Sequence, residues 1–277
     1  MQTIIITGAS SGVGKEAARL IAAHHPDDRL ILVGRNVEKT KAIATELQAE
    51  YLTADFGKLE DVRTLAAQIR ELTDTIDVLA NNAGGLFDGP RFTHDGFEYS
   101  FQVNHLAPML LTNLLFDILQ RSKATIVATS SIINRLGTLD LDHLATGENF
   151  RSSKAYAQGK LANILFTQEL HRRYHKDGIR AVSFHPGVVA SNFSTSSKSP
   201  LSLFYKSKLA STFGISSAEG GRRLAFFILN QSEALAASGT YYEQPLVPGA
   251  THAQAHDPAF AERFFDISSD LLKISWP

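Results

Sequence analysis

Tyr156 and Lys160 are the residues whose types and spacing point most directly to chemistry. Residues four apart lie on one face of a helix, so the phenol and the ammonium would lie side by side. A neighbouring cation favours the phenolate and lowers the pKa of a tyrosine from its usual value of about 10. A tyrosine tuned in this way can donate or accept a proton at neutral pH. Solvated Tyr–Lys pairs on helix surfaces have the same spacing, so the surrounding sequence must decide whether this pair is reactive.

A glycine-rich turn near the start of the chain predicts a dinucleotide site. The β-branched run 3–7 is typical of a buried parallel strand, and it leads into Gly8-Ala-Ser-Ser-Gly-Val-Gly14 and a helical sequence. Absent Cβ atoms let the backbone approach a pyrophosphate, and the helix N-terminus supplies N–H groups. The spacing differs from the common Gly-x-Gly-x-x-Gly, and a tight turn without a ligand is the alternative. The turn residues assigned to the cofactor are Gly8, Ser10, Ser11, Gly12, Val13 and Gly14.

The end of the second expected strand favours NADP(H) over NAD(H). An acidic residue about 20 positions beyond the glycine turn would bond the ribose 2′-hydroxyl of NAD. This chain has Gly34 there, followed by Arg35, whose guanidinium can bind a 2′-phosphate through two hydrogen bonds. A surface arginine at a strand end is the alternative. Asp55 follows the third expected strand, where it can accept a bond from the adenine amine or cap the next helix.

Strands and helices alternate at short spacing along the whole chain, without a repeat or a long linker. This alternation predicts an α/β, Rossmann-type, doubly wound parallel sheet of about seven strands with helices on both faces. We expect residues 1–277 to form a single domain. The expected strands cover 3–7, 30–33, 51–54, 76–80, 124–131, 179–184 and 240–242, and the main helices cover 15–23, 38–50, 59–72, 95–119, 156–174 and 258–272.

Several other segments are expected to lie beside the turn and the Tyr156 helix. Ser130 and Ser131 fall at a strand's carboxyl end, where open α/β sheets place their sites. Asn104 lies inside a helical segment, where it could bend the helix and hold a water or only satisfy a local carbonyl. His185 follows a strand, where it could be catalytic, although a structural histidine is the commoner case there. Segment 191–217 is either a substrate lid or a surface helix that packs on the body.

Composition narrows the possible functions. The net charge of -1 gives no sign of a nucleic-acid or membrane partner. The chain has no cysteine, which excludes thiolate catalysis and zinc–thiolate sites and is compatible with a cytoplasmic protein. Its ten histidines show no metal-ligand spacing, so no metal is expected. Neither a signal peptide nor a membrane-spanning helix is expected from the sequence.

Taken together in chain order, these motifs resemble those of the classical short-chain dehydrogenase/reductase superfamily, and within it the retinol-dehydrogenase-like group. The resemblance covers nearly the whole chain. It implies that Tyr156 is the general acid or base and that Lys160 lowers its pKa and bonds the nicotinamide ribose. It also implies that Ser131 holds the substrate oxygen and that Asn104 keeps a water in a proton relay. The remaining implied cofactor contacts are Arg35, Asn36, Asp55, Phe56, Asn82, Ala83, Gly84, Pro186, Gly187, Val188 and Ser191, the last standing where the family usually has threonine.

These observations predict an NADP(H)-dependent oxidoreductase that transfers a hydride between nicotinamide and a small-molecule carbonyl or alcohol, of apolar character. The alternatives are a dinucleotide-binding sensor or scaffold on the same fold, and an epimerase or dehydratase that recycles its hydride. Animal retinol dehydrogenases often carry an N-terminal membrane anchor, which we do not expect here, and this weakens an assignment to retinol itself. Protochlorophyllide reductases rely on a cysteine in the site, so the absence of cysteine argues against that activity. Apolar outer positions on the helices around Asn104 and Tyr156 would suit a homodimer or homotetramer, and they are also compatible with a monomer.

Overall fold

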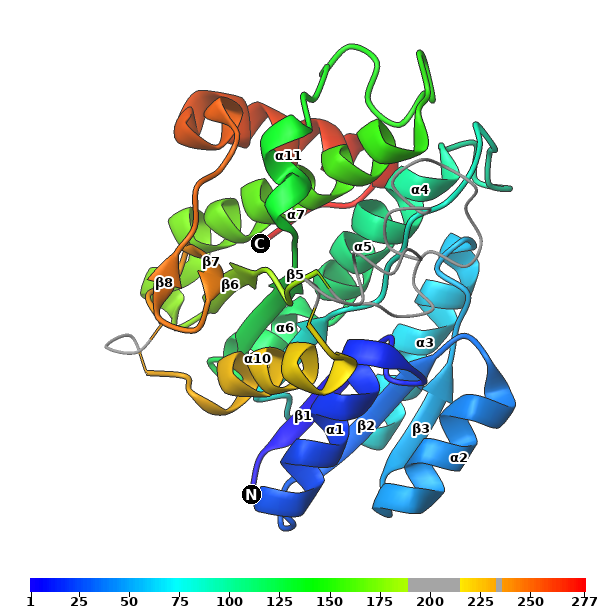
Figure 1. Cartoon of the computed structure of the whole chain (residues 1–277), viewed down its shortest axis with the longest axis vertical. Helices are drawn as coiled ribbons and strands as arrows, with labels where there is room; N and C mark the ends of the chain where they lie inside the picture. Colours follow the sequence, from blue (N-terminus) through cyan, green and yellow to red (C-terminus); the bar gives the residue numbers. More distant parts are fainter. Residues whose placement is uncertain (189–214, 233–235) are drawn as a thin grey trace.

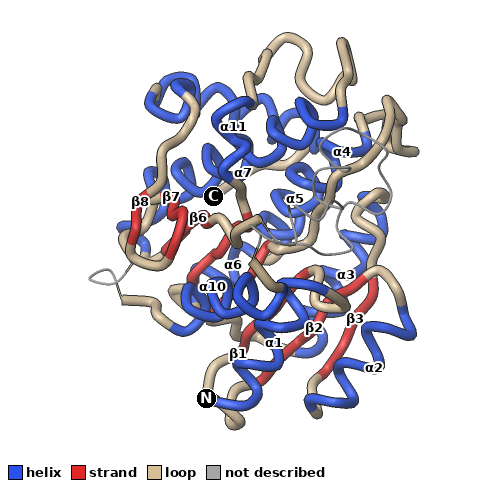
Figure 2. The backbone as a smooth tube through the Cα atoms, viewed as in Figure 1, coloured by secondary structure: helices blue, strands red, loops and turns tan. Residues whose placement is uncertain are grey.

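The computed structural model contains one eight-stranded sheet with helices on both faces (Figures 1 and 2). The structure describes residues 1–188, 215–232 and 236–277. The strand order is β3-β2-β1-β4-β5-β6-β7-β8. The predicted fold class is confirmed, with one strand more than expected, because the chain turns back after β7 and adds a two-residue antiparallel strand. The strands are β1 (Thr3–Thr7), β2 (Arg29–Gly34), β3 (Glu50–Thr53), β4 (Val78–Asn81), β5 (Thr125–Thr129), β6 (Arg180–Phe184), β7 (Tyr241–Gln244) and β8 (Val247–Pro248).

The strand order reverses between β1 and β4, so the sheet has a switch point at the carboxyl ends of these strands. Both faces of the sheet are buried, as the β-branched runs predict. Side chains alternate along β1, so Ile5 packs into one apolar core while Ile4 and Ile6 pack into the other. The first core contains α3 (Leu59–Leu72), α5 (Ala107–Leu114) and α7 (Ser152–Tyr174), and the second contains α1 (Gly12–His24), α2 (Val37–Leu47) and α10 (Ser217–Leu229).

The helix expected over 95–119 is interrupted. It consists of α4 (Tyr99–Phe101), a π-turn (Gln102–Leu106), α5 and α6 (Phe116–Arg121). The π-turn contains Asn104, whose side chain bonds to backbone groups outside the helix. By contrast, the expected helices over 59–72 and 258–272 have those bounds in the structure. Local periodicity predicts a regular helix well, but it carries no information on a distant hydrogen-bond partner.

The C-terminal segment covers the outer side of α7 and α6. Phe265 of α11 (Pro258–Leu272) stacks on Phe166 of α7 with ring centroids 6.0 Å apart. Trp276 packs edge-on against Phe116 of α6 at 5.1 Å. Some of the apolar positions that the sequence offered for a subunit interface are therefore buried within the chain. No helix in the described ranges is long and apolar enough to cross a membrane.

Phe265 should be a main contributor to this packing, since its side chain is fully buried. We expect Phe265→Ala to reduce the free energy of unfolding by about 3–5 kcal/mol, because it removes a buried ring and leaves a cavity. Phe92→Ala is the matched control, since Phe92 is 57% exposed. Urea unfolding of both variants measures the difference. Equal, small losses in the two variants would contradict the importance of the C-terminal helix.

Candidate active site

The carboxyl ends of β1, β4 and β5 are held together by one hydrogen-bond network. The Thr7 hydroxyl donates to the carbonyl of Ala80 at 3.0 Å and accepts the N–H groups of Asn82 at 2.9 Å and Ala83 at 3.0 Å. The Asn82 amide donates to the Thr7 carbonyl at 2.9 Å and accepts the Thr129 hydroxyl at 3.1 Å. The loop 82–85 is thereby fixed beside the glycine turn.

Gly8 and Gly14 pack too closely on this loop and on each other to carry side chains. Gly8 has φ +70°, and a Cβ on it would lie 2.9 Å from the Ala83 Cα. A Cβ on Gly14 would lie 2.5 Å from the Gly8 carbonyl oxygen. The first turn of α1 has no acidic residue, and the side chain of its N-cap, Ser11, makes no capping bond. The helix N-terminus therefore offers backbone N–H groups and positive potential to an anion.

At the end of β2 the structure leaves no room for an acidic side chain. A Cβ on Gly34 would lie 2.2 Å from the Thr40 hydroxyl oxygen and 3.0 Å from the Ser10 Cβ. Arg35 is exposed, and its Nη1 lies 3.4 Å from the Tyr99 hydroxyl. Asn36 caps α2, because its side chain accepts the Lys39 N–H at 2.8 Å. Ser10 and Arg35 thus flank a position from which steric crowding excludes a carboxylate.

Asp55 does not cap the helix that follows it. One of its carboxylate oxygens accepts the N–H of Gly57 at 3.0 Å, which closes a local turn. The first residue of α3, Leu59, donates instead to Asp95 at 3.0 Å. Phe56 is buried in the core, and its carbonyl accepts the Gln102 amide at 3.2 Å. The adenine role of Asp55 and Phe56 stays a prediction.

Tyr156 and Lys160 lie on α7, and both are buried, with 5% and 3% of their surface exposed. The Lys160 ammonium lies 5.3 Å from the centroid of the Tyr156 ring. It donates a hydrogen bond of 3.0 Å to the carbonyl of Thr129, the last residue of β5. Burial lowers the pKa of Lys160 to about 7, because desolvation disfavours the ammonium. The Lys160 ammonium can therefore lose its proton near neutral pH.

The two serines after β5 have different environments. The Ser130 hydroxyl is fully buried and donates to the Lys160 carbonyl at 2.7 Å, so it ties the sheet to α7. Ser131 opens the 3₁₀ turn Ile132–Leu136, and its hydroxyl oxygen accepts a long bond of 3.5 Å from Ile133. The Ser131 O–H donates no hydrogen bond to any of the described residues, so it is available to a substrate oxygen.

Asn104 lies behind Lys160 and is anchored to the backbone. Its amide nitrogen donates to the carbonyls of Gly85 at 2.9 Å and Ser100 at 2.8 Å, and its oxygen accepts the Gly85 N–H at 3.1 Å. A Cβ on Gly84 would lie 2.5 Å from the Asn104 oxygen and 3.4 Å from the Lys160 nitrogen. The side chains of Asn104 and Lys160 therefore both lie close to Gly84. The π-turn that contains Asn104 is of a kind that is frequent at functional sites.

The segment after β6 is only partly described. Gly187 has φ +99°, and the Val188 carbonyl accepts the N–H of Ile215 at 2.9 Å. Ser191 lies outside the described residues, as does most of the lid expected over 191–217, namely 191–214. His185 is buried, and burial together with the charges of Arg223 and Arg135 lowers its pKa to about 4. A neutral, buried imidazole agrees with the interpretation of His185 as a structural histidine rather than a catalytic one.

Three residues outside the predicted set help to build the site: Thr7, Thr129 and Asn163. The Asn163 amide donates to the same Thr129 carbonyl at 3.2 Å, beside the bond from Lys160. Asn163 stands seven residues beyond Tyr156, which is the same helix face, and this spacing could have revealed it. Thr7 and Thr129 are each the last residue of a strand at the predicted edge of the sheet. Their hydrogen bonds could not be predicted from the sequence, because these bonds depend on the order of the strands.

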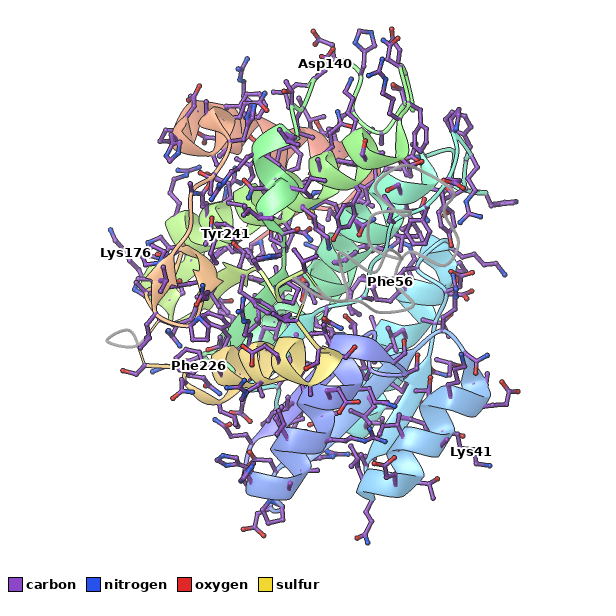
Figure 3. The ribbon with its side chains drawn as sticks, viewed as in Figure 1. Lys41, Phe56, Asp140, Lys176, Phe226 and Tyr241 are labelled. Carbon is purple, nitrogen blue, oxygen red and sulfur yellow. The ribbon has the colours of Figure 1, made fainter. Side chains whose placement is uncertain are left out.

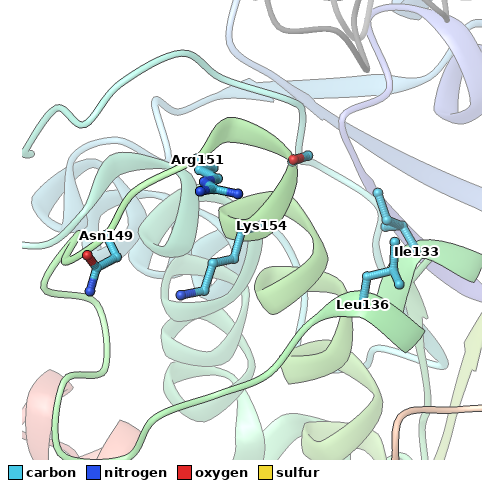
Figure 4. Close-up of a pocket in the computed structure, with 6 residues that line it drawn as sticks. Ile133, Leu136, Asn149, Arg151 and Lys154 are labelled. Carbon is cyan, nitrogen blue, oxygen red and sulfur yellow. The ribbon is translucent and has the colours of Figure 1, made fainter.

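A pocket of about 480 Å³ is lined by residues that lie near Ser131 and Tyr156 in the sequence. One side is formed by Ile133 and Leu136, which follow Ser131, and Figure 4 shows Asn149, Arg151 and Lys154 on the other. Ser153, one helical turn before Tyr156, also lines it. A ligand in this pocket would have both an apolar and a cationic surface to contact.

Comparisons with known proteins agree on one family. Residues 2–201 match the family model for short chain dehydrogenases. Retinol dehydrogenase 13 of Homo sapiens is 33% identical over 287 residues, which cover 100% of this chain and 86% of the relative. A solved structure from Mycobacterium paratuberculosis has a TM-score of 0.78 and 29% identity, covering 100% of this chain and 95% of its own. An alcohol dehydrogenase from the archaeon Thermococcus sibiricus, solved with 5-hydroxy-NADP, shares the fold with a TM-score of 0.66 and 21% identity, covering 91% of this chain and 100% of its own.

The buried Lys160 should make stability depend on pH. The pKa of this lysine is about 7 in the folded state and about 10.4 in an unfolded chain, so between these values the unfolded chain binds one proton more. The Lys160 contribution therefore raises the free energy of unfolding with pH, by up to about 1.4 kcal/mol per pH unit. Urea unfolding between about pH 7.5 and 9 should show a steeper rise for the native protein than for Lys160→Met. Identical slopes would refute the assigned environment.

Proposed function

Because the chain belongs to the short-chain dehydrogenase/reductase family, close to its retinol-dehydrogenase-like group, we propose that it is an NADP(H)-dependent oxidoreductase acting on a carbonyl or alcohol carbon. The observation that supports this most strongly is that Tyr156 and Lys160 lie side by side on α7. Ser131, whose hydroxyl could hold a substrate oxygen, follows the end of β5. A bound nicotinamide cofactor would supply or accept the hydride, and the protein would supply the proton and the orientation.

The proposed catalytic roles are those that the family resemblance implies, and the local geometry is compatible with them. In carbonyl reduction, the Tyr156 hydroxyl donates a proton to the carbonyl oxygen, while the Ser131 O–H donates a hydrogen bond to the same oxygen. In alcohol oxidation, the Tyr156 oxygen accepts the proton. Lys160, with its pKa lowered to about 7 by burial, can return a proton toward the phenol at neutral pH. Asn104 and the Thr129 carbonyl are positioning groups, since they hold the lysine and the loop behind it.

The cofactor site fits a dinucleotide in its steric and electrostatic properties. A Cβ at Gly8 or Gly14 would collide with neighbouring backbone atoms, so these positions stay free of side chains, and the first turn of α1 carries no competing acid. The 2′-phosphate of NADP would lie beside Ser10 and Arg35, where Gly34 leaves no space for the carboxylate that would favour NAD. These features support NADP(H) as the preferred cofactor.

A sensor or scaffold that only binds the dinucleotide is the second candidate. The environment of Lys160 argues against it, because this buried ammonium has no carboxylate partner among the described residues, and its burial costs free energy that binding alone does not require. The relative named for retinol supports an apolar alcohol or aldehyde as substrate, in agreement with the apolar wall at Ile133 and Leu136. Net consumption of the cofactor would exclude the recycling epimerase or dehydratase.

Tyr156→Phe tests the proposed acid. We expect aldehyde-dependent oxidation of NADPH, followed by absorbance, to fall by about 10²–10⁴-fold, because the phenol proton is lost. Binding of NADPH, followed by its fluorescence, should be retained. The control is Tyr51→Phe, since Tyr51 is 37% exposed on β3. Near-native turnover by Tyr156→Phe would remove this tyrosine from the mechanism.

Arg35→Ala tests the cofactor preference. The KM for NADPH should rise by about tenfold or more, while that for NADH should change little, because only NADPH carries the 2′-phosphate. Arg35 is a better target than Gly34, where any side chain would collide with Thr40. Arg263→Ala, an exposed change on α11, serves as the control. A parallel rise in both KM values would show that Arg35 does not distinguish the two cofactors.

A further inference from the structure

His105 is a fully buried histidine that the mechanism described above does not use. It lies in the π-turn Gln102–Leu106 and packs among three aromatic rings. The ring centroids of Phe101, Phe166 and Phe264 lie 5.4, 6.0 and 5.1 Å from the centroid of the imidazole. A polar ring in such apolar surroundings is costly unless its nitrogens are paired, so their partners are informative.

The Asn163 amide decides which imidazole nitrogen carries the proton. Nδ1 of His105 lies 3.4 Å from the Asn163 Oδ1, which makes a long hydrogen bond. The Asn163 amide nitrogen donates to the Thr129 carbonyl at 3.2 Å. Because a carbonyl can only accept, the amide oxygen must face His105, and Nδ1 must be the protonated nitrogen. Nε2 is then an unprotonated acceptor, in agreement with its having no partner among the described residues.

This chain of hydrogen bonds meets Lys160 at the Thr129 carbonyl. The Lys160 ammonium donates to the same oxygen at 3.0 Å. The oxygen has two lone pairs and can accept both bonds, but the two donors share its negative partial charge. The bond from Asn163 therefore reduces the stabilisation that this carbonyl gives to the ammonium. Without the imidazole N–H, the buried Asn163 oxygen would lose its described partner, and the amide would no longer be held against Thr129.

The charges around Lys160 leave room for such an adjustment by neutral groups. Tyr156 is the titratable side chain that faces the ammonium, whose nitrogen lies 5.3 Å from the ring centroid. No carboxylate oxygen of the described residues lies within 4.0 Å of that nitrogen, and burial alone lowers the pKa of Lys160 to about 7. Burial also lowers the pKa of His105 to about 3, so its imidazole is neutral near neutral pH.

We propose that His105 is a positioning residue that acts on Lys160 through the Asn163 amide. Its Nδ1–H holds this amide in the orientation that shares the Thr129 carbonyl with the lysine. The role rests on the proposed function, because release of a lysine proton near neutral pH serves an enzyme that transfers protons. The π-turn then has two tasks, since Asn104 fixes the loop beside the glycine turn and the next residue fixes a hydrogen-bond partner on α7.

Two substitutions of His105 separate this role from simple packing. In His105→Asn the amide nitrogen stands where Nδ1 does, so the donor toward Asn163 is kept, whereas His105→Leu removes it. Both variants lose ring volume and should unfold at lower urea concentrations than the native protein. The free energy of unfolding should begin to rise near pH 7 in the native protein and in His105→Asn. In His105→Leu we expect this onset about 0.5–1 pH unit higher, because the folded chain then holds the Lys160 proton more tightly.

The onset is assigned to Lys160 by its own substitution. In a Lys160→Met background, His105→Leu should shift nothing. Lys41→Met is the matched control, since Lys41 is exposed on α2 and Figure 3 shows it at the outer side of that helix. Above about pH 7.5 the imidazole is neutral in both the folded and the unfolded chain, so its removal adds no slope of its own there.

Equal onsets in His105→Asn and His105→Leu would overturn the proposal. Nitrogen NMR of the labelled imidazoles tests it in the native protein, and so also covers a variant that does not fold. The His105 signal should show the Nδ1–H tautomer, and the Nε2–H tautomer would refute the proposed chain of bonds. If NADPH reduces no aldehyde, the proposed function fails, while a shifted onset would still support the action of His105 on Lys160. Given turnover, the pH profile of kcat should move with the onset, and a profile that stays in place would exclude a role in the reaction.

Discussion

The hydrogen bond from the Lys160 ammonium to the Thr129 carbonyl is the contact on which the site depends. An ammonium buried this deeply needs a partner, and the last carbonyl of β5 supplies one where the strand ladder ends. Ser130 donates to the carbonyl of Lys160, and the Thr129 hydroxyl donates to Asn82, so the same junction continues to β4 and β1. The helix that carries the proposed acid is thereby held in register with the loop that would hold a cofactor.

Close backbone approach, rather than side-chain bulk, sets the position of Tyr156. A Cβ on Gly159 would lie 2.9 Å from the Cβ of Asn104, and one on Gly137 would lie 2.3 Å from the Ala157 carbonyl oxygen. Glycines therefore allow α7 to contact the π-turn on one side and the loop after β5 on the other. Larger residues at these two positions would push the helix outward and displace Tyr156. The glycine turn at Gly8 and Gly14 follows the same principle at the proposed pyrophosphate site.

The sequence predicts those parts of the fold that depend on local pattern. Helix 59–72 and helix 258–272 both follow from the periodicity of their apolar residues. The sequence raised a bend at Asn104 as one possibility, but the π-turn itself could not be predicted, because it depends on bonds to Gly85, nineteen residues away. Asp55 shows the same limit, since the sequence left a cap on the next helix open, and in the structure Asp95 accepts the Leu59 N–H while Asp55 closes a local turn. Strand order likewise brings Thr7, Asn82 and Thr129 together, although no spacing in the sequence marks them as neighbours.

The substrate pocket illustrates why composition is a poor guide to a binding surface. The leucines and phenylalanines around the site suggested an apolar ligand, yet many of them, such as Leu139 and Leu144, are buried in the core. The pocket wall is made instead by the exposed ends of two segments, one apolar and one cationic. Lys154 and Tyr156 are two residues apart on α7, so their side chains point to nearly opposite faces of the helix, in agreement with an exposed Lys154 and a buried Tyr156. Nearness in the sequence therefore does not make a residue part of the site, because the helix turns it toward solvent.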